Sequence, residues 1–246
     1  MGLTGDLLAR WASRRPHLLL AAAPGATAAR LAVEAHADRA GWPLAASPAD
    51  ADLLVVAGQP GSELAAAIER VWDQFPGPRA RVRIINPSGV ASGLHAAVAR
   101  LAGTERKLPD PGPDGGGSWR HGHGGHDGMS MPGGLMMAER AEDRDGLKLD
   151  VLHLALGPVL TDWPAGLVVE LSVQGDVVQS ASARVLPPAD PTAVRPYPDV
   201  DHPRLRRRRQ AVAHLDSLSR LWAVVGWPAG AATARRLRDA LVDDVP

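Results

Sequence analysis

Cysteine is missing from all 246 residues of the chain. The protein therefore forms no disulfide and offers no thiolate, which is the group that ligates most iron–sulfur clusters and serves as a strong nucleophile. Nothing indicates the disulfide-stapled scaffold of a small secreted protein. Thiol chemistry is thus excluded, whatever else the protein does.

An excess of charge of either sign is missing too, because 27 basic residues balance 27 acidic ones. A basic field for nucleic acid is absent, and the short run of arginines at 204–209 is too isolated to supply one. Long hydrophobic runs are also lacking, since the apolar stretch 18–29 is too short to span a membrane and contains Pro24 and Gly25. The N-terminus does not resemble a signal peptide. We expect a cytoplasmic protein with no nucleic-acid partner and no direct membrane insertion.

The first part of the chain alternates strand and helix signals. Short apolar runs predict buried strands at 17–23, 52–58 and 81–85, with a further short strand at 42–46. Amphipathic or alanine-rich segments between them predict helices at 26–40, 62–74 and 90–101. This alternation implies a parallel sheet covered on both faces. We expect an α/β domain over residues 1–104.

A segment rich in proline and glycine follows at 105–134. It has too few apolar residues to build a core, so we expect a disordered linker that marks a domain boundary. Residues 135–246 then form a smaller α+β domain. Alternating segments predict strands at 147–154, 167–173 and 177–185, with a hairpin turn at Gln174-Gly175-Asp176. Two helices are expected at 204–225 and 229–242.

The linker contains the residues best suited to hold a metal ion. His121, His123, His126 and Asp127 provide imidazole and carboxylate groups on one stretch, with methionines close behind. Such a set suits nickel, zinc or copper, with modest affinity because a flexible site must be ordered on binding. The alternative interpretation is a low-complexity linker that happens to be rich in histidine.

The sequence offers no convincing catalytic constellation. It has neither a Gly-x-Ser-x-Gly elbow nor a Walker-type lysine, and its Ser, His and Asp residues suggest no triad. The turn at 23–27 follows a strand and opens a helix, so its amides are placed to bind a phosphate. The alternative there is an ordinary strand-to-helix turn. An enzyme that binds a phosphorylated ligand is thus one hypothesis, but we expect no enzyme activity from this chain by itself.

Two motifs in the first domain resemble a known family. The segment 46–58, ASPADADLLVVAG, resembles the strand "SP…ADLLIVAG" of the small iron–sulfur subunit of respiratory complex I (the B subunit of NADH-quinone oxidoreductase) and of [NiFe]-hydrogenase small subunits. The segment 71–79, VWDQFPGPR, resembles "VYDQMPEPR" of the same family. The likeness covers about residues 17–103 and implies a flavodoxin-like fold.

The family carries its cluster cysteines after the first strand and after the strand that follows the second motif. Here these turns read AAAPGA at 21–26 and IINPSG at 84–89. The resemblance thus implies the fold without the cluster, and we expect no cofactor beyond a weakly bound divalent metal at the linker. More weakly, residues 156–178 resemble the opening β-meander of the large subunit of complex I (its D subunit), without the histidine of its quinone pocket.

These observations lead to three functional hypotheses. The first is a non-catalytic structural or assembly subunit of a complex-I-like or [NiFe]-hydrogenase-like oxidoreductase, without an iron–sulfur cluster of its own. Its partners would be subunits of that membrane-associated complex, which would hold the protein at the inner face of the cell membrane. The second is metal binding or delivery through the histidine-rich linker. The third is the α/β enzyme with a phosphorylated ligand.

Overall fold

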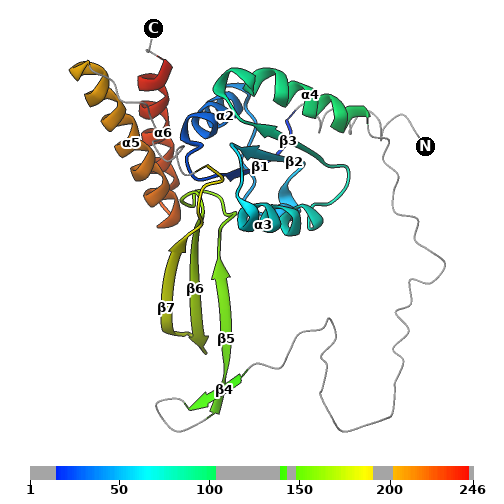
Figure 1. The fold of residues 1–246 in the computed structure, drawn as a ribbon, viewed down its shortest axis with the longest axis vertical. Coiled ribbons are helices and arrows are strands. Elements are labelled where there is room, and N and C mark those ends of the chain that lie inside the picture. Colours follow the sequence, from blue (N-terminus) through cyan, green and yellow to red (C-terminus); the bar gives the residue numbers. More distant parts are fainter. Residues whose placement is uncertain (1–14, 104–138, 143–147, 191–201, 244–246) are drawn as a thin grey trace, which may run out of the picture. The chain divides into compact units, whose positions relative to one another are not determined.

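The computed structural model describes residues 15–103, 139–142, 148–190 and 202–243 (Figure 1). The chain divides into two compact units, each described by itself below. The first unit combines residues 1–105, 157–168 and 184–246, and the second combines 106–156 and 169–183. This grouping differs from the domain limits 1–104, 105–134 and 135–246 expected from the sequence, because the two C-terminal helices join the first unit. The expected linker at 105–134 lies outside the described residues.

A parallel sheet forms the centre of the first unit. Its strands are β1 (Leu18–Ala22), β2 (Leu53–Ala57) and β3 (Ala80–Ile84), in the spatial order β1-β2-β3. Leu44 forms a parallel bridge with Leu18 on the outer edge of β1. The chain therefore runs outward from β1 and then returns across it, which is the flavodoxin-like arrangement with a reversal of strand order at β1. The strand expected at 42–46 is reduced to this single bridge.

Helices cover both faces of this sheet (Figure 1). On one face α2 (Thr27–Ala40) and α4 (Val90–Gly103) share a buried core with β1, β2 and β3. On the other face α3 (Ser62–Asp73) packs with β1 and β2. Short 3-10 turns, η1 (Pro48–Asp50) and η2 (Pro87–Gly89), precede β2 and α4. All five residues of β2 are buried because both of its faces are covered, and this explains its uninterrupted apolar sequence.

Two antiparallel helices complete the first unit. α5 (Pro203–Val224) and α6 (Pro228–Asp243) are joined by a tight turn at Gly226, whose φ is +81°. At the far end of the pair, Nε of Arg208 donates a hydrogen bond of 2.5 Å to the carbonyl oxygen of Leu241. The segment 157–168 belongs to the same unit. Thr161 ties this segment to the sheet, since its hydroxyl donates to the carbonyl oxygen of Ala45 at 2.6 Å.

The second unit is an antiparallel sheet. Its strands are β4 (Glu139–Glu142), β5 (Lys148–Leu156), β6 (Leu167–Gln174) and β7 (Val177–Val185), in the order β4-β5-β6-β7. β5 and β6 pair in a register that places Leu154 opposite Leu171. β6 and β7 are joined by a short turn that contains Gly175, with a φ of +60°. The hairpin expected at residues 174–176 is therefore confirmed, and with it the meander.

The predicted fold class is confirmed by these elements. A parallel α/β sheet comes first, an antiparallel meander follows, and two helices end the described chain. Within the described residues, no helix combines the length and the apolar character needed to cross a membrane.

Candidate functional site

The carboxyl ends of β1 and β2 lie at the point where the strand order reverses, which is where open α/β sheets bind their ligands. Here this point is closely packed. Gly58 follows β2 with a φ of +85°, and a Cβ atom at that position would lie 2.3 Å from Cβ of Ala26. Ala23 is buried against the same place. The small residues of the turn at 23–26 therefore fill this end of the sheet.

Backbone hydrogen bonds close the turn further. The amide of Ala23 donates to the carbonyl oxygen of Ala57 at 2.9 Å, and the amide of Ala26 donates to that of Ala23 at 3.0 Å. Gly166 packs on the turn as well, since a Cβ atom there would lie 2.7 Å from Cγ of Pro24. The two amides already have acceptors, so they are unavailable to the phosphate that the sequence suggested for this turn.

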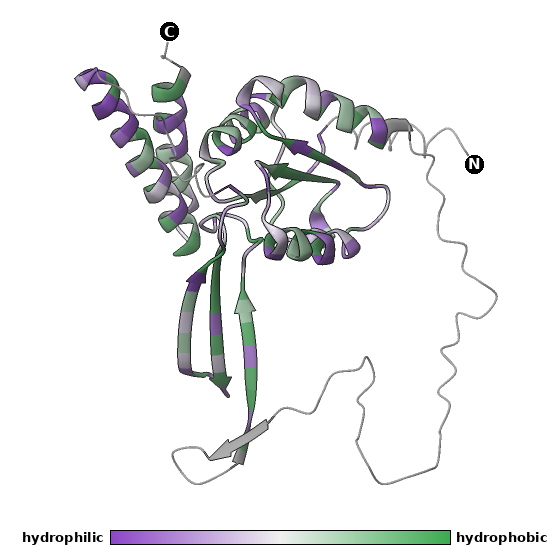
Figure 2. Ribbon diagram, viewed as in Figure 1, coloured by the Kyte–Doolittle hydropathy of each residue, from purple (hydrophilic) through white to green (hydrophobic). Residues whose placement is uncertain are grey.

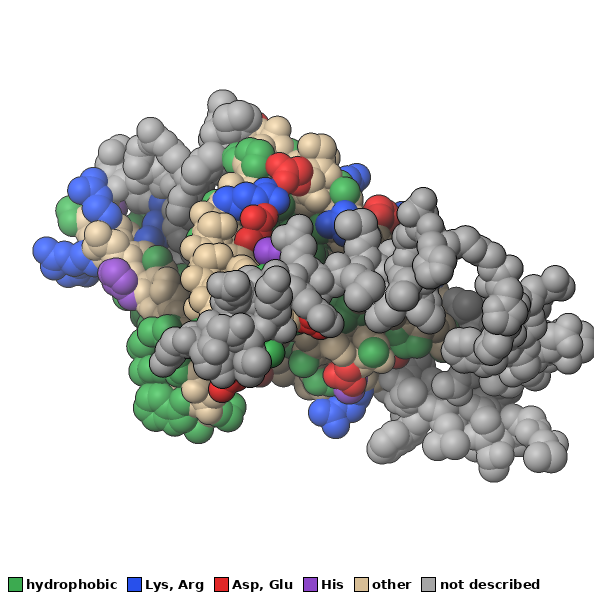
Figure 3. All heavy atoms as spheres, turned by 90° about the horizontal axis from the view of Figure 1, so that it is seen from below, with side chains coloured by type: hydrophobic (Ala, Val, Ile, Leu, Met, Phe, Trp, Pro, Cys, Tyr) green, Lys and Arg blue, Asp and Glu red, His purple; other side chains and the backbone are tan. Residues whose placement is uncertain are grey.

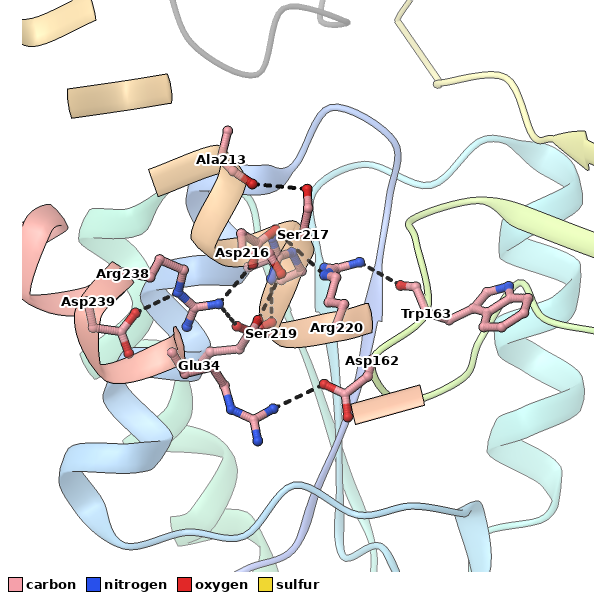
Figure 4. A network of polar contacts seen from close by, with 12 residues as sticks. Glu34, Asp162, Trp163, Ala213, Asp216, Ser217, Ser219, Arg220, Arg238 and Asp239 are labelled. Carbon is pink, nitrogen blue, oxygen red and sulfur yellow. Dashed lines mark hydrogen bonds and ion pairs between the residues drawn. The ribbon is translucent and has the colours of Figure 1, made fainter. Parts of the chain in front are cut away.

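A buried cluster of charged side chains lies beside the outer edge of β1. It joins α2, α5 and α6 to the segment 157–168, and it contains equal numbers of guanidinium and carboxylate groups (Figure 4). Its members are Arg30, Arg220, Arg235, Arg238, Glu34, Asp162, Asp216 and Asp239.

Arg238 of α6 is the centre of the cluster, and its side chain is only 1% exposed. Its Nη1 donates to Glu34 at 2.7 Å and to Asp216 at 2.9 Å, while its Nε donates to Asp239 at 2.8 Å. Figure 4 shows the side chain reaching Asp239 on its own helix and the other two carboxylates on α2 and α5. One guanidinium group thus holds three helices together.

Arg30 completes the connection between α2 and α5. Its two terminal nitrogens donate to Glu34 at 2.5 Å and to Asp216 at 2.6 Å. Arg220, one turn after Asp216, donates to the carbonyl oxygen of Trp163 at 2.7 Å. Arg235 of α6 donates to Asp162 at 3.1 Å. The last two bonds fix the segment 157–168 against the helix pair.

The remaining nitrogen of Arg238, Nη2, is buried and has no hydrogen-bond partner among the described residues. Arg238 lines a small cavity of about 30 Å³, together with Ser219, Thr161 and Leu20. That volume is enough for about one water molecule. This cavity is too small for an organic ligand, whereas Glu34, Asp162 and Arg238 also line a more open hollow of about 340 Å³.

The neighbouring guanidinium groups keep the side chain of Glu34 ionised. Burial alone raises the pKa of Glu34, but Arg30, Arg238 and Arg220 together outweigh it and hold the pKa at about 2. Burial dominates at Asp162 and at Asp239, where the pKa is raised in spite of the neighbouring guanidinium groups. Burial and the charge of Arg30 lower the pKa of Arg220. A carboxylate with a pKa of about 2 is a poor general base at neutral pH.

The hydroxyl groups near the cluster are occupied as well. Oγ of Ser219 donates to the carbonyl oxygen of Asp216 at 2.8 Å, and the hydroxyl of Thr161 donates to Ala45. Neither hydroxyl is paired with a base that could activate it as a nucleophile. The arrangement is therefore suited to fixing the packing of helices, and it lacks the parts of a hydrolytic or transfer site.

The residues predicted to bind a metal are not brought together by the structure. His121, His123, His126 and Asp127 lie outside the described residues. Within the described ranges, no group of three or more His, Asp and Glu side chains is placed to hold a metal ion. The metal site at the linker thus stays a prediction.

Sequence reasoning missed the charged cluster, although part of its signal was present. Arg30 and Glu34 are four residues apart on one predicted helix, and so are Asp216 and Arg220 on another. Such spacing is common on solvent-exposed helix faces. Only the packing of α6 against α2 shows that these pairs are buried.

Part of the chain is similar to known proteins. The B subunit of NADH-quinone oxidoreductase from Hydrogenobaculum sp. is 38% identical over 74 residues, which is 29% of this chain and 40% of that protein. The B subunit from Aquifex aeolicus is 36% identical over 74 residues, with the same shares. That from Desulfovibrio desulfuricans is 36% identical over 72 residues, which is 29% of this chain and 39% of that protein.

The chain thus spans about two fifths of the length of these relatives. No protein-family model and no solved structure matches it. The likeness to the B subunit is confirmed over this part, while those to the hydrogenase small subunit and to the large subunit of complex I stay predictions. Because the chain has no cysteine, it lacks the thiolate ligands of an iron–sulfur cluster.

Proposed function

We propose that this protein is a non-catalytic structural or assembly subunit of a complex-I-like or [NiFe]-hydrogenase-like oxidoreductase, without an iron–sulfur cluster of its own. The partial likeness to the B subunit of NADH-quinone oxidoreductase supports a place in such a complex. The partners would be the other subunits of the complex, and they would hold the protein at the inner face of the cell membrane.

One observation carries the proposal. The strand-end turn in which the resembling family holds cluster cysteines is here built from alanine, proline and glycine, and it is packed without room for a cluster. The parallel sheet around the turn is kept. A protein that keeps the parallel sheet but has no space for a cluster at the strand ends is better suited to contacts with partner subunits than to electron transfer.

The test is capture of the tagged full-length protein from its native host in a mild detergent. We expect mass spectrometry to find subunits of an NADH-quinone oxidoreductase or of a hydrogenase, in amounts well above those captured by the tag alone. Recovery of the protein without any subunit of either complex, at a detergent concentration that keeps those complexes intact, would contradict the proposal.

Metal binding or delivery through the linker is a second proposal. It rests on the sequence, where His121, His123 and His126 fall within six residues of one another beside Asp127. Calorimetric titration of the full-length protein with nickel or zinc should show binding that is lost when the three histidines are changed to alanine. As a control, His153, His202 and His214 are exposed histidines elsewhere in the chain, and changing them should leave binding intact. Equal binding by both triple variants would rule out a site at the linker.

The third hypothesis, an enzyme with a phosphorylated ligand, finds least support. The turn suggested for the phosphate uses the amides of Ala23 and Ala26 within its own backbone. The turn is also covered by Gly166.

A further inference from the structure

The end of α5 and the beginning of α6 form a tip without charge. From residue 221 to residue 234 the sequence reads LWAVVGWPAGAATA and contains no acidic or basic residue. The antiparallel packing of the two helices brings both halves of this stretch to the same end of the pair. We call residues 221–227, at this end, the α5–α6 tip.

Four large side chains of the α5–α6 tip are exposed. Leu221, Val224, Val225 and Trp227 are 57%, 55%, 66% and 54% exposed. Leu221, Val224 and Val225 lie on one side of the helix end because they are three and four residues apart. Figure 3, which shows the molecule from below, has hydrophobic side chains at its surface on the left. Single exposed apolar residues need no explanation, but a continuous group of them indicates a surface that is covered in the cell.

Contacts within the tip hold its two helix ends together. The amide of Trp227 donates to the carbonyl oxygen of Trp222 at 2.7 Å, and the two indole rings meet edge to face with centroids 4.8 Å apart. Gly230 lies against both rings, since a Cβ atom there would be within 3.0 Å of each. The exposed side chains are therefore presented on a fixed scaffold, which reduces the entropy lost when they are buried.

Charge is segregated along the axis of the helix pair. Five of the six residues at 204–209 are arginines at the beginning of α5, and no charged residue follows Arg220 in that helix. In α6 the charged residues begin only at Arg235. Figure 2 shows the same change along α5, from hydrophilic at its first turns to hydrophobic at its end.

This axial pattern favours one kind of partner. A helix that docks sideways into a protein groove has an apolar stripe along its length, whereas here the apolar residues occupy one end. An uncharged end with aliphatic side chains and a tryptophan suits the lipid–water interface, where indole rings are enriched. The charges at its border are paired, Arg220 with Asp216 and Arg235 with Asp162, so the contact would depend little on anionic lipid.

We propose that the α5–α6 tip contacts the lipid–water interface of a membrane directly, with Leu221, Val224, Val225 and Trp227 placed among the headgroups and the first acyl carbons. The contact is peripheral and adds to the proposed role in a complex without depending on it. It is a contact at the surface of the membrane and goes beyond the expectation from sequence that the chain makes no direct insertion.

The test uses the purified full-length protein and vesicles of phosphatidylcholine, with or without phosphatidylglycerol, in a flotation gradient. We expect the protein to float with both kinds of vesicle. The double variant Val224→Asp, Val225→Asp should reduce the bound fraction about tenfold or more, because two carboxylates must then enter the interface. Both valines are exposed, so thermal unfolding should show an unchanged fold.

The matched control is Val177→Asp, Val178→Asp, another adjacent pair of exposed valines at 42% and 54%. This variant should float like the wild type. The proposal is overturned if the wild type floats with neither vesicle, or if the two double variants lose binding equally. It is also overturned if the wild type instead associates with itself in size-exclusion chromatography and Val224→Asp, Val225→Asp abolishes that association, because the tip is then a protein interface.

A second measurement does not depend on charge. Vesicles with brominated acyl chains quench tryptophan fluorescence only at close approach. We expect them to quench the wild type and to quench Trp227→Leu distinctly less, while the leucine keeps vesicle binding within about twofold. Equal quenching of both proteins would place the contact elsewhere and overturn the proposal.

Discussion

At the scale of single residues, Gly58 is the position that decides whether the end of the sheet is open or filled. Its φ of +85° is the left-handed region that favours glycine, and its missing side chain lets the turn at 23–26 approach β2 closely. The resemblance to the B subunit implies that this place holds a cluster in that family. Here Ala23 and Ala26 occupy this space, so the close packing depends on several small residues together.

We predict that Gly58→Ala lowers the free energy of unfolding by about 2–4 kcal/mol, from backbone strain and a steric clash with Ala26. Gly226→Ala is the matched control, because Gly226 has a similar φ of +81° and open space around it. It should cost only about 1 kcal/mol, from strain alone. Urea unfolding of the two variants measures the difference, and equal losses would show that the turn is not closely packed.

The lowered pKa of Glu34 leads to a prediction about pH. This pKa is about 2 in the folded protein, against an ordinary value of 4.5 for an unperturbed glutamate, so the folded state favours the ionised form. That preference contributes stability above pH 4.5, and the contribution is lost as the pH falls from there toward 2. Its full size is about 3 kcal/mol.

Replacing Glu34 by glutamine removes this contribution. The difference in unfolding free energy between wild type and Glu34→Gln should be constant from pH 7 to about 5 and should shrink steadily below that. Burial, and to a smaller extent the charge of Glu34, raise the pKa of Asp162 and Asp239, which gives these groups the opposite dependence. The comparison cancels the part caused by burial, because that part is common to both proteins. A difference that is the same at pH 3 and at pH 7 would show that Glu34 is not paired as described.

At the scale of elements, the charged cluster links α2 to α6 through Glu34 and Arg238. Breaking a buried ion pair leaves an uncompensated charge, so Arg238→Met alone should cost about 3–5 kcal/mol. A double-mutant cycle of Glu34→Gln and Arg238→Met should give a coupling energy of about 1–3 kcal/mol. Urea unfolding of the four proteins supplies the cycle.

The exposed pair of Glu63 and Arg184 is the control for this cycle. Its two atoms are 2.8 Å apart, which is close to the 2.7 Å between Arg238 and Glu34, but both side chains are about half exposed. Its cycle, Glu63→Gln with Arg184→Met, should give less than about 0.5 kcal/mol. Similar coupling in the two cycles would mean that burial does not set the strength of the α2–α6 link.

The elements themselves were predictable from sequence because local patterns specify them. The run 52–58 became β2 over Leu53–Ala57, and 177–185 became β7 over Val177–Val185. The segment 42–46 did not form the predicted strand, since within the described residues it pairs with β1 by one bridge, at Leu44. Tertiary pairing, and not propensity, decides how long such an edge segment remains a strand.

The packing of α5 and α6 with the parallel sheet could not be read from the sequence. It depends on pairings such as that of Arg238 with Glu34, which are 204 residues apart. Residues so distant leave no periodic signal, and arginine and glutamate on alanine-rich helices resemble ordinary solvent-exposed charges. The turn at the strand ends was predicted from sequence as free of cysteine and as having amides placed for a phosphate, but its close packing required the structure.

At the scale of the whole molecule, the absence of cysteine governs the redox properties. We predict that the purified protein, treated anaerobically with iron and sulfide, retains no stoichiometric iron and shows no visible absorption from a cluster. A cysteine-containing B subunit of NADH-quinone oxidoreductase, treated in parallel, is the positive control. A stable coloured protein with bound iron would contradict the proposal that the protein holds no cluster.

The first unit is discontinuous in sequence, and this affects how it is made. Glu34 leaves the ribosome 204 residues before Arg238, which is roughly 10–40 s at ordinary rates of translation. The strands β1, β2 and β3 are all synthesised by residue 84, but the ion pair between Glu34 of α2 and Arg238 cannot form until α6 emerges. During that interval the carboxylate of Glu34 is still hydrated, and its side chain is still free to move. Synthesis therefore passes through a state in which the parallel sheet can fold but α6 has not yet packed against α2. The synthesis of α6 then sets the time at which the first unit is complete and can take part in assembly.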